Sequence, residues 1–144
     1  MVGVYWQGET PPTNFYLALI KATPAPTRAT VTLSQVAEIE DGNGYTEGGY
    51  QLNRDSTDFD TLTEETGDPY TVTQMLKDII WNASGGPIPS SSTGARYAVL
   101  TNDNATIANR EVLFVFDLVG ERTVSVGQAI TLRDLTMVGE ATAT

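Results

Sequence analysis

The feature that most constrains this chain is a series of short apolar or alternating segments, each ended by a turn. Phe15 to Ile20, Ala95 to Thr101 and Val112 to Leu118 are the clearest, and residues such as Gly, Pro, Asn and Asp separate them. Short runs of this kind, rich in β-branched and aromatic residues, are typical of strands. They do not alternate with helical segments. The pattern therefore predicts a single all-β domain, an antiparallel β-sandwich or jelly-roll.

Further strands are expected over 50–55, 70–75 and 79–81, and the segments 95–101 and 112–118 should pair as a hairpin. A second hairpin is predicted from 122–126 and 129–135, around the Gly127-Gln128 turn. Ser34 is expected to cap a short helical turn over 35–39, and residues 58–68 are expected to form an acidic loop. The domain should span 14–138, between an extended N-terminal arm at 1–13 and a C-terminal tail at 139–144.

The segment from Val112 to Leu118 is apolar at nearly every position. A strand with only one face on the core cannot bury such a sequence alone. Either a subunit interface covers the other face, or the strand is central and a loop shields it. The second arrangement is favoured.

The chain contains neither histidine nor cysteine. It therefore lacks the commonest general base, the commonest ligand of transition metals and the thiolate ligands of structural zinc. Only carboxylate chemistry or a bound cofactor could support catalysis. We expect a non-enzymatic protein that has no cofactor and acts through its surface.

The formal net charge is −10, from 8 basic and 18 acidic residues, and the basic residues are scattered singly. Without a basic cluster to neutralise phosphates, binding to nucleic acid is not expected, nor is binding to an acidic membrane. A positively charged protein would be attracted. The first ten residues do not show the pattern of a signal peptide, and no apolar run is long enough to span a bilayer.

Acidic residues gather between positions 55 and 68, where Asp55, Asp58 and Asp60 are weak candidates for a cation site, since Ca²⁺ prefers carboxylate oxygens. Their spacing does not match a calcium-binding loop. A solvated acidic loop without metal is the favoured interpretation. Acid–base hydrolysis by Asp58 and Asp60 is a third, less favoured alternative.

Several aromatic and loop residues are candidates for contacts with other subunits. Tyr5 and Trp6 in the N-terminal arm would either dock on a neighbouring subunit or pack on their own domain. Tyr45 and Tyr50 flank the glycine pair Gly48-Gly49 and would either lie on the surface or close one end of the domain. The remaining candidates, Pro87 and Ser91, lie in a loop rich in Ser, Gly and Pro.

The order of several segments also suggests a family. The segment 14–19 (NFYLAL) is followed by 32–39 (TLSQVAEI), the glycine–tyrosine stretch 44–50, 80–86 (IWNASGG), 95–100 (ARYAVL), Phe116 to Leu118, and 124–128 (VSVGQ). In this order they resemble a family of small virion proteins of tailed bacteriophages, often described as structural or tail-fibre-like. The resemblance covers roughly residues 14 to 135. The extended first segment and the acidic loop do not match the family's pattern.

The resemblance implies a β-sandwich without catalysis that has a place in the virus particle and is made in the host cytoplasm. The favoured function is a capsid decoration or cement protein, a dimer or trimer whose partner is the major capsid protein. The alternatives are a tail- or fibre-associated protein, including a receptor-binding one, and a carbohydrate-binding module.

Overall fold

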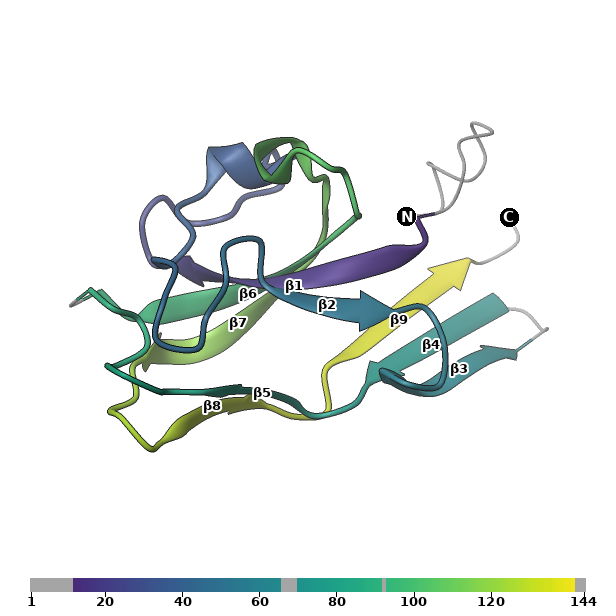
Figure 1. Cartoon of the computed structure of the whole chain (residues 1–144). Helices are drawn as coiled ribbons and strands as arrows, with labels where there is room; N and C mark the ends of the chain where they lie inside the picture. Colours follow the sequence, from purple (N-terminus) through teal and green to yellow (C-terminus); the bar gives the residue numbers. More distant parts are fainter. Residues whose placement is uncertain (1–11, 66–69, 92, 142–144) are drawn as a thin grey trace.

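The computed structural model describes residues 12–65, 70–91 and 93–141, and this part of the chain is all-β with antiparallel pairing, as predicted (Figure 1). Two three-residue 3-10 turns, Leu33–Gln35 and Ile107–Asn109, are its only helical elements within those ranges. The strands are β1 (Asn14–Lys21), β2 (Tyr50–Asn53), β3 (Phe59–Glu65), β4 (Tyr70–Leu76), β5 (Ile79–Asn82), β6 (Ala95–Thr101), β7 (Val112–Arg122), β8 (Ala129–Leu132) and β9 (Thr136–Ala141).

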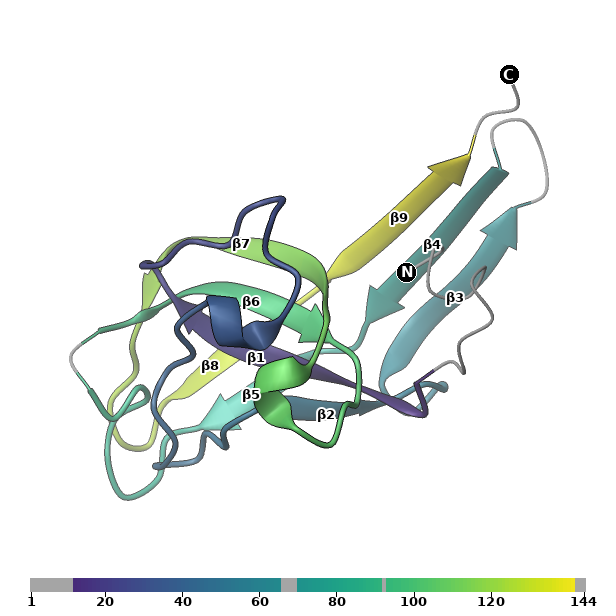
Figure 2. The same cartoon turned by 90° about the horizontal axis from the view of Figure 1, so that it is seen from above.

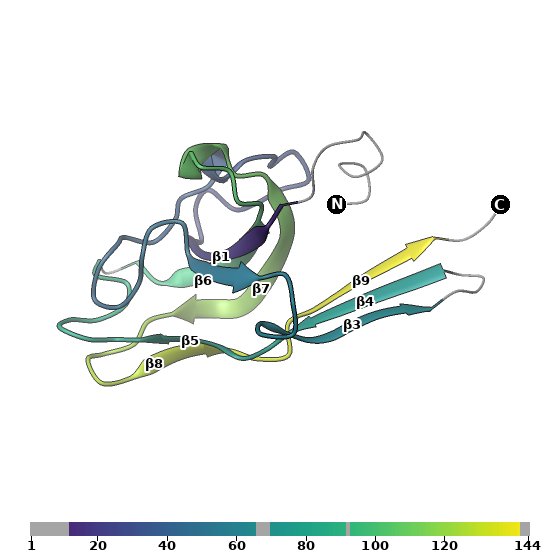
Figure 3. The same cartoon turned by 45° about the vertical axis from the view of Figure 1, so that its right-hand side comes forward.

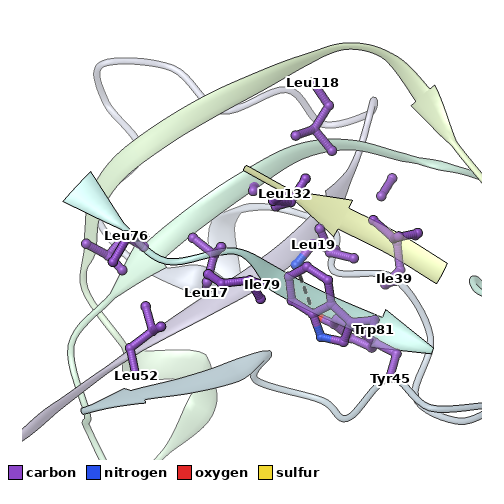
Figure 4. Packing of buried hydrophobic residues seen from close by; sticks show 14 of the residues in the cluster. Leu17, Leu19, Ile39, Tyr45, Leu52, Leu76, Ile79, Trp81, Leu118 and Leu132 are labelled. Carbon is purple, nitrogen blue, oxygen red and sulfur yellow. Dashed lines mark hydrogen bonds between the residues drawn. The ribbon is translucent and has the colours of Figure 1, made fainter. Parts of the chain in front are cut away.

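The body of the protein consists of two layers, a four-stranded sheet in the order β2-β1-β6-β7 and the two-stranded sheet β5-β8 (Figure 3). Apolar side chains from both sheets form the core between them (Figure 4). Leu17 and Leu19 of β1 and Leu100 of β6 face Trp81 of β5 and Ile130 of β8 across this core, all at most 3% exposed. The body is therefore sandwich-like.

Strand β1 is buried on both faces, which explains its unbroken apolar sequence. Leu17 and Leu19 enter the main core, whereas Ala18 and Ile20 pack in a second cluster beneath the segment that joins β1 to β2. Leu33 and Val36 of that segment cover this cluster. The expected cap at Ser34 is wrong. The turn begins earlier, at Leu33, and the Gln35 side-chain oxygen accepts hydrogen bonds from the backbone N–H groups of Val31 and Thr32 at 2.6 and 3.0 Å.

Strands β6 and β7 form the predicted hairpin, but β7 is an edge strand and not the central strand expected. Its Phe114 and Phe116 are only partly buried, and Val115 is 43% exposed. The second predicted hairpin is also wrong. Val124 pairs with Ile88, and β8 pairs with β5, so the chain crosses from one sheet to the other at the Gly127 turn.

Strands β4 and β5 together form one side of a long antiparallel ribbon, and β8 and β9 form the other. Met75 lies opposite Thr136, and Ile79 lies opposite Leu132. Each side therefore advances by four residues between the two pairs, so the register continues without a break. The ribbon bends where Asp134 adopts a positive φ of 52°, beside the ion pair of Arg133 with Asp78 at 3.4 Å. Beyond the bend, β3 adds to β4, and the sheet β3-β4-β9, here called the β-arm, projects from the body (Figures 1 and 2).

The β-arm corrects the expectation of an acidic loop over 58–68, because residues 59–65 form β3. Threonine alternates with other residues in this segment and favours a strand, whereas the acidic neighbours are typical of a loop. Strand β9 extends to Ala141, so residues 139–141 of the expected tail lie in a sheet. The expected N-terminal arm at 1–13 lies outside the described residues except for its last two.

The base of the β-arm belongs to the core of the body. At its base, Phe59, Leu76 and Met137 are at most 4% exposed and belong to the main core. The register places positions 62, 64, 70, 72 and 74, which are Leu, Glu, Tyr, Val and Gln, on the same face as Leu76. Among the described residues, no element packs over the outer half of that face (Figures 1 and 3).

Candidate interaction surfaces

The loops 41–50 and 84–94 lie together at the end of the body opposite the β-arm (Figure 1). The Asn43 side chain donates a hydrogen bond to the carbonyl oxygen of Pro87 at 2.9 Å, and the Ser84 N–H donates to the carbonyl of Asn43 at 2.9 Å. Residue Asn43 has a φ of 57°, which asparagine tolerates better than most residues. The two loops therefore form one connected surface, here called the loop end.

A buried phenol and a carboxylate anchor the loop end to β1. The Tyr45 hydroxyl accepts a hydrogen bond from the Leu19 N–H at 3.0 Å and donates one to Glu38 at 2.5 Å. The same Glu38 oxygen accepts the Gly48 N–H at 2.7 Å. Burial raises the pKa of the Glu38 carboxyl above its usual value, against the lowering effect of these hydrogen bonds. Burial and the neighbouring Glu38 raise the pKa of Tyr45 well above 10.

The raised pKa of Glu38 makes stability depend on pH. Because the folded chain holds this proton more tightly than the unfolded chain does, the resulting stabilisation is present below pH 4.5 and is lost as the pH rises through the folded pKa. Glu38→Gln keeps an acceptor and removes the charge. We expect this variant to match the parent at pH 4 and to equal or exceed its free energy of unfolding at pH 7.

Urea denaturation at both pH values measures this effect, and Glu121→Gln, at an exposed position, is the control and should follow the parent. A Glu38→Gln variant that loses stability at pH 7 but not at pH 4 would show that the ionised carboxylate stabilises the loop end.

The structure separates the six predicted contact residues. Tyr5 and Trp6 lie outside the described residues. Tyr45 is not a surface residue, since it is 2% exposed and its hydroxyl accepts a hydrogen bond from the Leu19 N–H in the interior. Tyr50 is 39% exposed and packs edge-on against Trp81, and Pro87 is exposed at the loop end.

Ser91 is half-buried and donates a hydrogen bond to Glu40 at 2.5 Å. Hydrogen bonds from Lys21 and, secondarily, from Ser91 lower the pKa of Glu40 to about 2. Ser91 therefore holds its loop to the strand region around Glu40, and it presents less of its side chain to a partner than Pro87 does.

The three candidate metal ligands do not converge. Asp55 accepts the Thr57 N–H at 2.8 Å, and Asp58 accepts both the backbone and the side-chain N–H of Asn53 at 2.7 and 2.8 Å. Asp60 follows in β3 and is exposed. These carboxylates shape the turn between β2 and β3, and no group of three potential ligands that could hold a metal ion occurs within the described ranges.

A groove opens along the side of the body between the end of β7 and β8. Its volume is about 600 Å³, and its lining is mixed, with apolar side chains, two threonines and two arginines, and without an acidic residue. Five consecutive residues of β8 and its end border it, so the free edge of that strand faces the groove. The lining comprises Leu118, Arg122, Thr123, Val124, residues 129–133 and Leu135.

Above the groove, the chain bulges out of β7 at Val119. Its side chain is 85% exposed, and its backbone has a φ of 61° with the N–H donated to Asp117 at 2.6 Å. A β-branched residue is unfavourable in that conformation, and an exposed valine gains nothing from burial. Both costs fall on one residue, and backbone strain of this kind clusters at functional sites such as ligand clamps and switch regions.

Val119→Gly should therefore stabilise the isolated chain by about 1 kcal/mol, because glycine adopts a positive φ without steric cost. Val115→Gly in the same strand, without a positive φ, is the matched control and should be destabilising. Thermal denaturation of both variants compares them directly. Equal destabilisation by the two changes would contradict a strained backbone at Val119.

In comparisons with known proteins, no family model, curated protein or solved structure matches the chain. In the part of the chain that the structure describes, no helix is long and apolar enough to cross a membrane.

Proposed function

We propose that the chain is a non-enzymatic structural subunit of a tailed-bacteriophage virion, most specifically a capsid decoration or cement protein. The single observation that carries this proposal is the β-arm. A three-stranded sheet projects from the body, and Phe59, Leu76 and Met137 at its base belong to the hydrophobic core. Apolar surface of this kind gains free energy when another subunit covers it, at about 25 cal/mol per Å².

The surface offers further contacts of the same type. Val119, Ile80 and Val126 are exposed apolar residues, at 85%, 47% and 60%. The negative net charge of the chain would favour contact with a positively charged neighbour. The resemblance to small virion proteins suggests that this neighbour would be another protein of the virus particle.

Immunogold labelling of purified virions tests the proposal. Antibodies against the chain should label the capsid surface at many positions on each head. Absence of label from intact particles, together with absence of the chain from their protein content by mass spectrometry, would contradict a virion protein altogether.

The tail or fibre remains the second candidate, because the loop end includes the exposed residues Tyr50 and Pro87. Loops held together in this way are suited to binding a receptor. Label confined to the tail would favour this candidate over decoration. A carbohydrate-binding module is less favoured, since Phe15 and Trp81, two of the aromatic residues that could line a sugar site, are at most 5% exposed.

A further inference from the structure

A two-residue turn in the loop end consists of Asn43 and Gly44, the only asparagine–glycine pair in the chain. Both residues have a positive φ, of 57° and 104°. Gly42 and Tyr45 close the turn with two backbone hydrogen bonds of 2.8 and 3.1 Å. A two-residue turn with two positive φ values favours asparagine followed by glycine. The geometry of the loop end therefore selects this dipeptide.

The turn also keeps a chemically reactive pair in place. A Cβ at Gly44 would lie 2.0 Å from the backbone oxygen of Asn82, so a larger residue does not fit there. Glycine after asparagine favours deamidation, because without a Cβ its nitrogen can approach the asparagine side chain closely. Gly44 is exposed to solvent, and within the described part of the chain its N–H donates no hydrogen bond.

Deamidation joins the Gly44 nitrogen to the side-chain carbon Cγ of Asn43. A C–N bond forms and closes a five-membered succinimide ring, while the bond from Cγ to Nδ2 breaks. The side-chain nitrogen takes the proton of the Gly44 N–H and leaves as ammonia. Water then opens the ring at either of its two carbonyl groups, which gives aspartate or isoaspartate. Water is the only co-reactant.

The folded loop end opposes this reaction. Nδ2 of Asn43 donates a hydrogen bond to the Pro87 carbonyl at 2.9 Å, and the Asn43 carbonyl accepts the Ser84 N–H at 2.9 Å. The amide also lies close to Gly86, where a Cβ would be 2.4 Å from Nδ2. Ring closure requires the side chain to turn from Pro87 towards the Gly44 nitrogen. The reaction therefore proceeds from states in which the contact between the two loops is open.

We propose that Asn43 is a site of spontaneous deamidation, and that its conversion releases the loop 84–94 from the loop 41–50. A carboxylate at position 43 has no N–H to donate, so two acceptors face each other at Pro87. In the isoaspartate product, an additional backbone carbon also disrupts the turn that Gly42 and Tyr45 close. The loop end is thus a surface with a limited lifetime. This inference does not depend on the proposed function.

Peptide mapping by mass spectrometry, after incubation of the full chain at mildly alkaline pH, measures the conversion. Asn43 should convert before any other asparagine, with a mass increase of about 1 Da. Gly86→Ala places a Cβ against the Asn43 amide and should speed conversion at least about fivefold, because the contact with Pro87 opens more often. Gly120→Ala, whose Cβ meets nothing within 4 Å, is the control and should convert at the parent rate.

Hydrogen–deuterium exchange of the Asn43→Asp variant tests the release of the loop. Amides of residues 84–91, including the Ser84 N–H, should exchange faster than in the parent. Asn104→Asp is the matched control, because it adds the same charge at an exposed position. The Asn104 side-chain oxygen accepts the Thr106 N–H at 3.0 Å, and aspartate keeps that acceptor. Exchange in this control should follow the parent.

Three results would each overturn the inference. They are an intact Asn43 while another asparagine converts, equal conversion rates in the parent and the Gly86→Ala chain, and exchange of residues 84–91 in Asn43→Asp at the parent rate. Immunogold labelling of virions tests the proposed function separately, since all three measurements use the isolated chain.

Discussion

Replacing Gly49 by alanine is expected to destabilise the chain by about 3 kcal/mol or more. Gly49 has a φ of 83°, and a Cβ there would lie 2.1 Å from the Leu17 carbonyl oxygen and 2.6 Å from the Ala18 Cα. Those atoms belong to the backbone of β1, which is fixed in the centre of the sheet. The alanine can be accommodated only if β2 moves away from β1.

Urea denaturation followed by circular dichroism measures the loss. Gly120→Ala is the control, because a Cβ at Gly120 meets nothing within 4 Å. It should change the free energy of unfolding by no more than about 0.5 kcal/mol. Equal effects of the two substitutions would show that the close approach of Gly49 to β1 does not exist in solution.

The second large effect is expected from Trp81→Ala, at about 3–5 kcal/mol of destabilisation. Trp81 is 3% exposed and lies in the β5-β8 layer. Its ring packs beside that of Tyr45 (Figure 4), with the two centroids 6.1 Å apart, and the centroid of the Tyr50 ring is 6.2 Å away. Since Tyr45 is hydrogen-bonded to β1, removal of the indole leaves a cavity between the two layers and loosens the loop end.

Ile80→Ala is the matched control, because Ile80 precedes Trp81 in β5 and its side chain is 47% exposed on the opposite face. Its cost should be well under that of Trp81→Ala, by the same denaturation measurement. A larger loss at Ile80 than at Trp81 would reverse the assignment of inner and outer faces of β5.

The strands that carry the core were predictable because their sequences are locally consistent. Phe15 to Ile20 is apolar throughout since β1 is covered on both faces, and the segment 95–101 was predicted with the bounds that β6 has. Strand β3 was not predicted because Asp60, Glu64 and Glu65 are residue types typical of loops. In a sheet that projects into solvent, such residues reduce the free energy of unfolding only slightly.

Pairing between distant segments decided the features that the sequence could not reveal. The turn at Gly127 predicts a hairpin locally, yet Val124 pairs with Ile88 and β8 with β5, and this separation of β7 from β8 forms the groove. For Tyr45, beside a glycine pair, the sequence left open a surface contact and a place that closes one end of the domain. Tyr45 is buried, and its hydroxyl hydrogen-bonds to the Leu19 N–H and to Glu38. The sequence does not indicate that either partner lies near Tyr45.

We propose that this protein acts through contacts that cover its β-arm in an assembled particle. Hydrogen–deuterium exchange of the amides in β3, β4 and β9 tests it most directly, in the purified chain at high dilution and in intact virions. Slower exchange of these strands in the virion, with little change in β1 and β6, is the predicted result. Identical exchange of the β-arm in both samples would contradict the claim.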